Sequence, residues 1–307
     1  MRAALRTSGG LASSVHDVGD RRFDTVSFLS DYGTSDEFAG VVRAVIRDLA
    51  PHATVIDLTH DVPPFDVRAG SLALARCIGY VPSGVVLAVV DPGVASDRKA
   101  VAIEVADGAG VLIGPDNGLL APAVAMAGGA ERAVELTNPE YHLEAAGATF
   151  AGRDVFAPAA AHLCNGVDLT ELGPEIDPGL LLPATVPLPR EEGDSLVGEV
   201  LWVDRYGNCQ LNVGPDDLPE GWGPHIQLRY LDGVEYQTRR AARATSFAEL
   251  GTATVGLVLD SYGMLAVSVD RRSAADELGL GPNSQVILSE LAGPPPQTTS
   301  VTLGPRA

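Results

Sequence analysis

Two short polar clusters carry many of the side chains in this sequence that could do chemistry: residues 30–37 (SDYGTSDE) and residues 91–98 (DPGVASDR). In the first, Asp31 is a candidate nucleoside contact, because a carboxylate at a strand end can accept from both hydroxyls of a ribose. Asp36 could accept from an ammonium group. Both residues also have a structural interpretation, since Asp36 can complement a helix dipole and Asp31 can cap a turn.

The second cluster combines an acidic residue, a sharp turn and a positively charged residue. Pro92 and Gly93 would turn the chain directly after a strand and direct Asp91 into a cleft, where Arg98 could return to pair with it. The alternative is a surface turn with an incidental ion pair, and the local sequence does not separate the two interpretations.

Three further segments connect predicted elements. Residues 149–154 (TFAGRD) precede a helix, and a turn of small residues there would let a ligand approach backbone N–H groups. Residues 203–208 (VDRYGN) and 260–263 (DSYG) lie between predicted strands. Taken alone, an ordinary helix start or strand connection is the better interpretation of each.

The sequence carries no metal or dinucleotide signature. His60, His142 and His162 lack metal-ligand spacing, so we interpret them as structural and predict no metal site. Residues 114–118 (GPDNG) indicate a turn rather than a phosphate loop. There is no GxGxxG, Walker loop, GxSxG or HExxH pattern, which argues against a Rossmann oxidoreductase.

The clusters must be positioned by alternating strands and helices. Apolar runs predict strands, and 84–90 (GVVLAVV) is continuous enough for a strand buried on both faces. Helical spacing predicts helices, with Ser35 as the N-cap of the first. The predicted strands are 25–30, 54–58, 84–90, 100–106 and 111–113, and the predicted helices are 36–50, 67–80, 119–127 and 155–165. A Rossmann-like α/β domain with a mostly parallel sheet would place Asp31 and Asp91 where such sheets bind ligands.

The sequence pattern changes after a proline-rich segment at 180–192. Beyond it, short alternating segments separated by turn residues predict a small all-β barrel, or a sandwich. The predicted strands there are 196–203, 209–213, 226–231, 254–259, 265–269 and 286–288. The predicted organisation is a flexible leader (1–23), an α/β domain (24–182), a linker (183–194), a barrel domain (195–293) and a tail (294–307).

Composition narrows the choice of partners and compartment. The formal net charge of -19 argues against binding to nucleic acid or to anionic membranes, because both need clustered Lys and Arg. No apolar run is long enough to span a membrane. Cys77, Cys164 and Cys209 are scattered, which fits a reducing compartment. These features predict a cytoplasmic protein with a small-molecule partner.

In this order, the motifs resemble those of the S-adenosyl-L-methionine (SAM) hydroxide adenosyltransferases, adenosine-forming SAM hydrolases that are related to fluorinases and chlorinases. The resemblance runs from about Thr25 to Leu288. It implies an N-terminal α/β domain, a linker and a C-terminal β-barrel. It also implies hydrolysis of SAM at C5′ to adenosine and L-methionine without a cofactor, in a homotrimer whose sites lie between one subunit's N-terminal domain and its neighbour's barrel.

The resemblance also implies roles for individual residues. Asp91 and Arg98 match two members of the family's Asp-Arg-His set for water activation. Asp31 matches the aspartate that holds the ribose diol, and Phe65 matches an aromatic residue beside the ribose and sulfur. The other implied substrate contacts are Asp36 and Asp204, near the methionine ammonium, and Phe150, Gly152, Tyr206, Asn208, Phe247 and Ser261.

One position departs from the family pattern. The family reads Phe-His-Gly-Arg-Asp, whereas this chain has Ala151, which can neither accept a proton nor orient water. A reduced turnover is therefore expected. Halide-using relatives replace the acid at the Asp91 position, because a carboxylate repels an anion, so Asp91 with Arg98 favours water. A 5′-halo-5′-deoxyadenosine synthase and a non-catalytic protein that binds SAM or adenosine are the alternatives.

Overall fold

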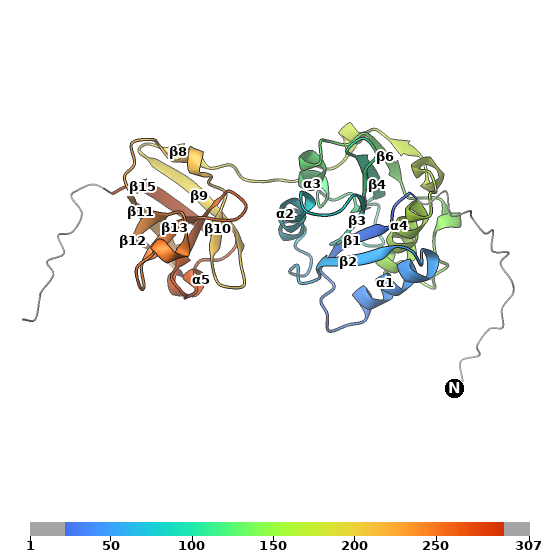
Figure 1. Cartoon of the computed structure of the whole chain (residues 1–307), viewed down its shortest axis with the longest axis horizontal. Helices are drawn as coiled ribbons and strands as arrows, with labels where there is room; N and C mark the ends of the chain where they lie inside the picture. Colours follow the sequence, from blue (N-terminus) through green and yellow to red (C-terminus); the bar gives the residue numbers. More distant parts are fainter. Residues whose placement is uncertain (1–21, 292–307) are drawn as a thin grey trace, which may run out of the picture. The chain divides into compact units, whose positions relative to one another are not determined.

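The computed structural model describes residues 22–291 (Figure 1). Its contacts divide the chain into two compact units between Thr185 and Val186, a point inside the segment predicted as a linker. Apart from Arg22 and Phe23, the predicted leader lies outside the described residues, and so does the whole predicted tail.

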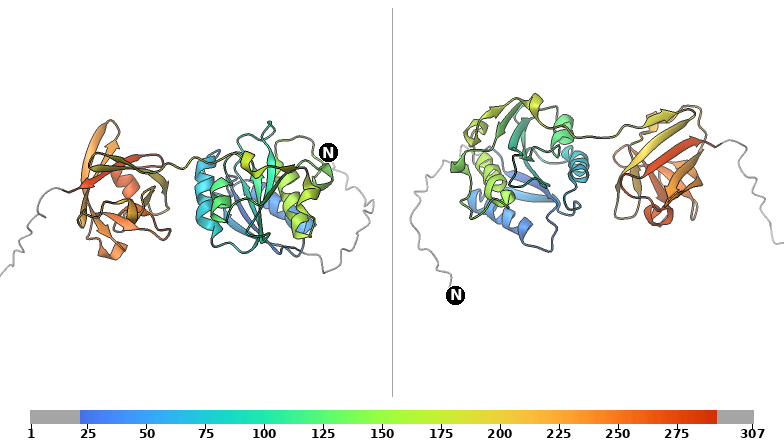
Figure 2. Two further views of the ribbon diagram at one scale, coloured as in Figure 1. Left: turned by 90° about the horizontal axis from the view of Figure 1, so that it is seen from above. Right: turned by 180° about the vertical axis from the view of Figure 1, so that it is seen from behind.

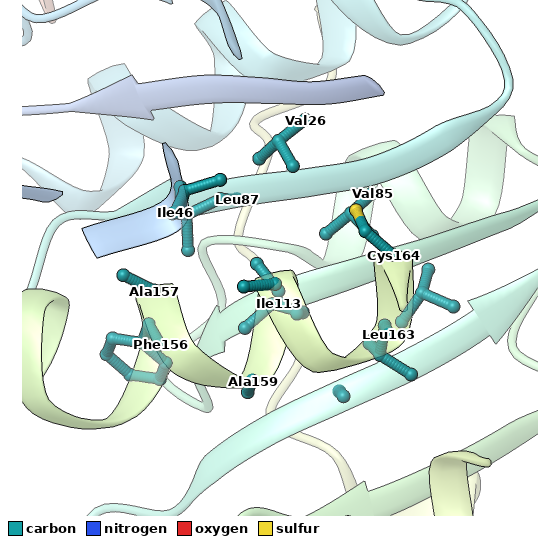
Figure 3. Close-up of a cluster of buried hydrophobic side chains, with 14 of the residues drawn as sticks. Val26, Ile46, Val85, Leu87, Ile113, Phe156, Ala157, Ala159, Leu163 and Cys164 are labelled. Carbon is teal, nitrogen blue, oxygen red and sulfur yellow. The ribbon is translucent and has the colours of Figure 1, made fainter. Parts of the chain in front are cut away.

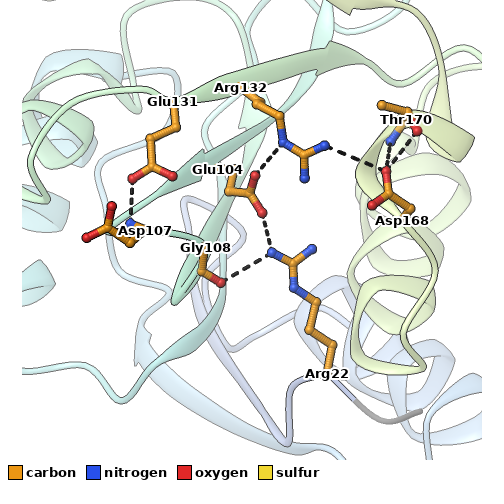
Figure 4. A network of polar contacts seen from close by, with 8 residues as sticks. All are labelled: Arg22, Glu104, Asp107, Gly108, Glu131, Arg132, Asp168 and Thr170. Atoms are coloured by element: carbon orange, nitrogen blue, oxygen red, sulfur yellow. Dashed lines mark hydrogen bonds and ion pairs between the residues drawn. The ribbon is translucent and has the colours of Figure 1, made fainter.

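Arg22 and Phe23 belong to the folded first unit. Phe23 is buried in its core. The Arg22 side chain donates to the Glu104 carboxylate and to the carbonyl of Gly108, in a network that also includes Arg132 (Figure 4). The leader prediction is therefore wrong at its last two residues, because nothing in the local sequence shows that the partners of Arg22 lie about eighty residues further along.

The first unit is built on a seven-stranded sheet in the order β2-β1-β3-β5-β4-β6-β7. Strand β1 pairs in parallel with β2 and β3, and β3 with β5, whereas β4 is antiparallel to β5 and β6. The strands are β1 (Thr25–Ser30), β2 (Thr54–Thr59), β3 (Gly84–Val89), β4 (Ala100–Val105), β5 (Gly110–Pro115), β6 (Arg132–Glu135) and β7 (Glu175–Ile176). The α/β prediction is confirmed, and each of the parallel pairs in this sheet includes β1 or β3.

Helices cover both faces of this sheet. Helices α1 (Phe38–Leu49) and α4 (Ala157–Cys164) pack on one face, and α2 (Val67–Ile78) and α3 (Ala121–Met126) on the other (Figures 1 and 2). Alternate residues of β3 enter the two cores: Val85 and Leu87 the first (Figure 3), Val86 and Ala88 the second. Strand β3 is thus buried on both faces, as predicted. Among residues 22–291, no helix is both long and apolar enough for a membrane span.

Two helix starts differ from the prediction. Helix α1 begins at Phe38, with Glu37 at its N-cap and no side-chain cap, so the prediction of Ser35 as N-cap is wrong. Residues 31–37 instead form a loop that Gly33 turns with a φ of 67°. Before α4, Gly152–Phe156 forms a π-helical turn, a feature that is frequent at functional sites. Both departures border the candidate site.

The second unit is an all-β barrel, as predicted. Its strand order is β10-β14-β13-β12-β11-β15-β9-β8, and pairing of β10 with β9 closes the sheet. Strand β8 lies within the segment predicted as a linker, and the sequence did not indicate β12. The strands are β8 (Arg190–Glu192), β9 (Ser195–Val203), β10 (Cys209–Leu211), β11 (His225–Asp232), β12 (Glu235–Ala244), β13 (Val255–Leu259), β14 (Leu265–Val269) and β15 (Gln285–Glu290), with a short helix α5 (Ala274–Leu278) after β14.

Candidate active site

A cavity of about 580 Å³ opens where the loops after β1, β2 and β3 come together with the residues before the π-helical turn. Open α/β sheets bind ligands at this edge, and the volume suits a small organic molecule. The cavity is lined by Asp31, Tyr32, Gly33, Ser35, Asp36, Phe38, His60, Asp61, Val62, Pro63, Pro64, Phe65, Asp91, Val94, Thr149, Ala151 and Gly152. Most N-terminal site residues predicted from the sequence are therefore brought together.

Asp91 and Arg98 form a bidentate ion pair beside this cavity. Arg98 Nε donates to Asp91 Oδ1 at 2.8 Å, and Nη2 donates to Oδ2. The aspartate side chain is 6% exposed and the arginine side chain 14%. The guanidinium also lies over the Phe156 ring, 5.3 Å from its centre. Because the pair is bidentate and largely buried, it is fixed in position, and the interpretation as an incidental surface pair is wrong.

A turn at 114–118 holds both ends of the loop that carries this pair. Asn117 Nδ2 donates to the carbonyl oxygen of Val90 at 2.9 Å. The backbone N–H of Asp116 donates to the carbonyl oxygen of Lys99 at 2.8 Å. Val90 directly precedes Asp91, and Lys99 directly follows Arg98. By holding both of these residues, the turn sets the spacing between the two partners of the ion pair. The sequence indicated the turn but not what it holds.

Asp31 faces the cavity and also shapes the loop after β2. Its Oδ2 accepts from the N–H of Phe65 at 2.9 Å. Phe65 has a φ of 68°, which costs a non-glycine residue roughly 1–3 kcal/mol, and the residue is 72% exposed. Burial raises the pKa of the Asp31 carboxyl, and the charge of Asp91 adds to this, while the Phe65 N–H opposes it. A carboxylate offers about four lone-pair positions, so Asp31 can still accept from a ligand.

Tyr32, which sequence reasoning did not single out, lies beside Ala151 and Gly152 in the cavity wall. Its ring centre is 5.7 Å from that of Phe38 and 5.8 Å from that of Phe150. Its hydroxyl oxygen would lie 2.2 Å from a Cβ built on Gly152. Glycine is therefore required at position 152 for this tyrosine to keep its place. A tyrosine directly after a strand-end aspartate was the only sequence signal that could have pointed to it.

His60 borders the same cavity with both ring nitrogens bonded. Nδ1 is 2.8 Å from Ser30 Oγ, and Nε2 is 3.1 Å from Asp57 Oδ1. The Ser30 hydroxyl oxygen in turn accepts from the backbone N–H of Tyr32 at 3.3 Å. This chain of contacts orients the loop after β1, and both ring nitrogens are occupied, as expected of a structural histidine.

Carboxylates dominate the charge of the cavity. Asp31, Asp36, Asp61 and Asp91 all line it, and no lysine or arginine is among the lining residues. An acidic cavity attracts a cationic ligand. Phe150, predicted as a substrate contact, is not among the lining residues and packs against the rings that are.

In the barrel, three of the residues predicted to contact the substrate lie around one cavity. Tyr206, Asn208 and Phe247 line a cavity of about 420 Å³ in the second unit, with the tyrosine 78% and the phenylalanine 49% exposed. Sequence reasoning missed the end of β14 and the residues that follow it, because they read as another turn. They complete the lining with Val269, Asp270, Arg271, Arg272 and Ser273.

Two other barrel residues have different surroundings. Asp204 Oδ1 accepts from the N–H groups of Tyr206 and Asn208 at 2.8 and 2.9 Å. Asp204 therefore shapes the turn that presents those two residues to their cavity. Ser261 lies in the loop between β13 and β14 and is not among the residues lining that cavity.

Both units match models of known families. Residues 26–173 match the SAM hydroxide adenosyltransferase N-terminal domain, and residues 198–287 match the C-terminal domain of the same family. A protein of Salinispora tropica named (R)-S-adenosyl-L-methionine hydrolase is 41% identical over 264 residues, which cover 85% of this chain and 96% of the relative. A fluorinase of an Actinoplanes species is 27% identical, over 79% of this chain and 90% of its own.

A solved structure resembles the whole fold. The crystal structure of an uncharacterized conserved protein from Thermotoga maritima has a TM-score of 0.76 and 31% sequence identity. The match covers 86% of this chain and 100% of that one. With both family models matched and a relative at 41% identity over most of its length, the chain belongs to the SAM hydroxide adenosyltransferase family.

Proposed function

We propose that this protein hydrolyses SAM at C5′ and releases adenosine and L-methionine. The observation that carries the proposal is the largely buried Asp91–Arg98 pair, fixed at the edge of a cavity that three further carboxylates line. The substrate bears a sulfonium and an ammonium group, and the lining carboxylates attract both. The name of the Salinispora tropica relative supports the same substrate.

In the proposed reaction, a water oxygen forms a bond to C5′ while the C5′–S bond breaks and its electrons stay on sulfur. The sulfonium is already a good leaving group, so no acid has to protonate it. The protein must supply a water in line with the breaking bond, and such alignment is worth ~7–11 kcal/mol. Asp91 accepts the proton that the water loses. Arg98 fixes the carboxylate and stabilises negative charge developing on the oxygen.

The other cavity residues bind and orient the substrate. Asp31 accepts from the ribose hydroxyls, Phe65 faces the ribose, and Asp36 attracts the ammonium group. We further propose a cytoplasmic homotrimer without a cofactor, in which the barrel of a neighbouring subunit completes each site. Tyr206, Asn208 and Phe247 would then contact the ligand. The three residues line one cavity, and the exposed side chains of Tyr206 and Phe247 are suited to stacking on the ligand.

A halide nucleophile is the second candidate function, because the chain is 27% identical to a fluorinase. The geometry favours water over a halide. An incoming anion would approach Asp91 in a cavity lined by three further carboxylates, and the Arg98 guanidinium beside it is already paired with Asp91. Like charges at such short range repel, and a neutral water avoids this cost.

Incubation with SAM, with and without chloride or fluoride, tests the proposal. Chromatography should show adenosine and methionine in equal amounts under both conditions. Formation of a 5′-halo-5′-deoxyadenosine would instead identify a halogenase. Tight binding of SAM with no methionine released would identify a binding protein.

Restoring the family residue should accelerate the reaction. Ala151→His should raise kcat by roughly tenfold or more, since a positioned base contributes ~10²–10⁴-fold, with little change in the Kd for SAM. Ala148→His is the matched control, because Ala148 is exposed and does not line the cavity. Steady-state kinetics and calorimetry check both values, and an unchanged kcat would contradict the role given to position 151.

Weakening the turn that holds the reactive loop should slow the chemistry. Asn117→Ala removes the hydrogen bond to the carbonyl of Val90, worth ~1 kcal/mol, so kcat should fall by roughly tenfold or less with KM nearly unchanged. Asn138→Ala is the control, because Asn138 makes a comparable bond to the carbonyl of Glu171 outside the cavity. A rise in KM alone would mean that the turn affects binding and not the ion pair.

A further inference from the structure

We propose that the Tyr32 hydroxyl is the second contact of the attacking water and takes over the position-fixing role that Ala151 cannot perform. The inference rests on the proposed hydrolysis and adds a catalytic residue to it. Tyr32 would then take part in the reaction as well as in the packing of the cavity wall.

The hydroxyl of Tyr32 lies in the right place for this role. Tyr32 lines the cavity together with Asp91, Ala151 and Gly152. A Cβ built on Gly152 would lie 2.2 Å from the hydroxyl oxygen, which places the hydroxyl directly beside the residue that follows Ala151. Because Ala151 and Tyr32 line the same cavity, a side chain at position 151 and the Tyr32 hydroxyl can both approach a water bound in it.

The ring of Tyr32 is held so that its hydroxyl keeps this position. Its centre lies 6.4, 5.7 and 5.8 Å from the ring centres of Phe28, Phe38 and Phe150. Its backbone N–H donates to Ser30 Oγ at 3.3 Å. Within the part of the chain that the structure describes, no protein group hydrogen-bonds the Tyr32 hydroxyl. A partly buried hydroxyl in a cavity wall needs a partner, and a water or ligand in the cavity can supply it.

A neutral phenol can perform this task. A water that attacks carbon is best oriented when its hydrogens point to acceptors and its lone pair points to C5′. Asp91 accepts one hydrogen and takes the proton as the C–O bond forms, and Tyr32 Oη accepts the other. Burial, with the charges of Asp31 and Asp91, raises the pKa of Tyr32 above its ordinary value, so the phenol stays protonated. Tyr32 thus acts by hydrogen bonding and ends the reaction unchanged.

Removing only the hydroxyl tests this role. Tyr32→Phe keeps the ring and should lower kcat by roughly 10- to 100-fold, with KM changed by less than about threefold. Tyr141→Phe is the matched control, because the Tyr141 ring packs on His162 and does not line the cavity. Thermal unfolding of Tyr32→Phe near the wild-type temperature shows that the fold is intact.

A double-variant cycle with position 151 separates catalysis from structure. In the Ala151→His background, Tyr32→Phe should cost less than about threefold in kcat, because the imidazole then orients the water. The pH profile of Ala151→His should also gain an inflection near the ordinary imidazole pKa of about 6.5, and the wild-type profile should show none there.

The outcomes are distinct. Full activity of Tyr32→Phe, or an equal loss in both backgrounds, would overturn the role of Tyr32 and leave the hydrolysis intact. If the wild-type protein forms no adenosine from SAM at all, the proposed function itself fails. A loss confined to the Ala151 background supports the inference.

Discussion

Changing Asp91 to asparagine should lower kcat by roughly 10²–10⁴-fold, the range expected when a positioned base is lost. The amide keeps the shape of the side chain but cannot take a proton from the water. It also leaves Arg98, which is only 14% exposed, without its anionic partner. Binding of SAM should change much less than kcat, because the ribose is assigned to Asp31. Single-turnover kinetics and titration calorimetry measure the two effects separately.

Asp97→Asn is the matched control for this variant. Asp97 belongs to the same loop but is exposed and does not line the cavity, so its loss should leave kcat within about twofold. Thermal unfolding of both variants checks that the loop is still folded. If Asp91→Asn kept kcat within tenfold of the wild-type value, the assignment of Asp91 as the group that accepts the water's proton would be wrong.

Adding one methyl group at Gly152 should impair both stability and turnover. The new Cβ would lie 2.2 Å from the Tyr32 hydroxyl oxygen and 3.1 Å from its Cζ. Because the ring is packed among three phenylalanines, it cannot move away freely. Overpacking of this kind costs ~1–3 kcal/mol in free energy of unfolding. We expect Gly152→Ala to lose that much in denaturant unfolding and to lose at least as much kcat as Tyr32→Phe.

A second substitution tests the cause of this loss. In Gly152→Ala combined with Tyr32→Phe, the worst contact is gone, so part of the stability should return while kcat stays low. Gly147→Ala is the control, because a Cβ there would meet no atom within 4 Å. If Gly152→Ala were as stable and as active as Gly147→Ala, the packing of Tyr32 against the π-helical turn would not matter for function.

The sequence predicted the reactive loops well because their positions follow from strand ends. Strands buried on both faces read as continuous apolar runs, and Asp31 and Asp91 come directly after two of them. Parallel pairing of β1 with β3 then brings both residues to one edge. The sequence alone did not decide whether Asp91 and Arg98 form a functional pair or an incidental surface pair, because only the fold shows that the pair is bidentate and largely buried.

Other features could not be predicted from local patterns. Strand β12 reads EYQTRRAARA and lacks clear apolar alternation, since most of its side chains are solvent-accessible and only its pairing with β11 and β13 makes it a strand. Serine is a favoured N-cap residue, but Ser35 lies in the loop that lines the cavity, and α1 begins only at Phe38. The place of Tyr32 depends on contact with Gly152, about 120 residues away, which no spacing rule reveals.

The central claim is that a water bound to Asp91, whose carboxylate Arg98 fixes, attacks C5′ of SAM. Hydrolysis in water enriched in the heavy isotope of oxygen is its most direct test. Mass spectrometry of the products should find the label in the 5′ oxygen of adenosine and none in methionine. Labelled adenosine should disappear with Asp91→Asn in parallel with kcat. Unlabelled adenosine, or label on the amino-acid product, would contradict attack of water at C5′.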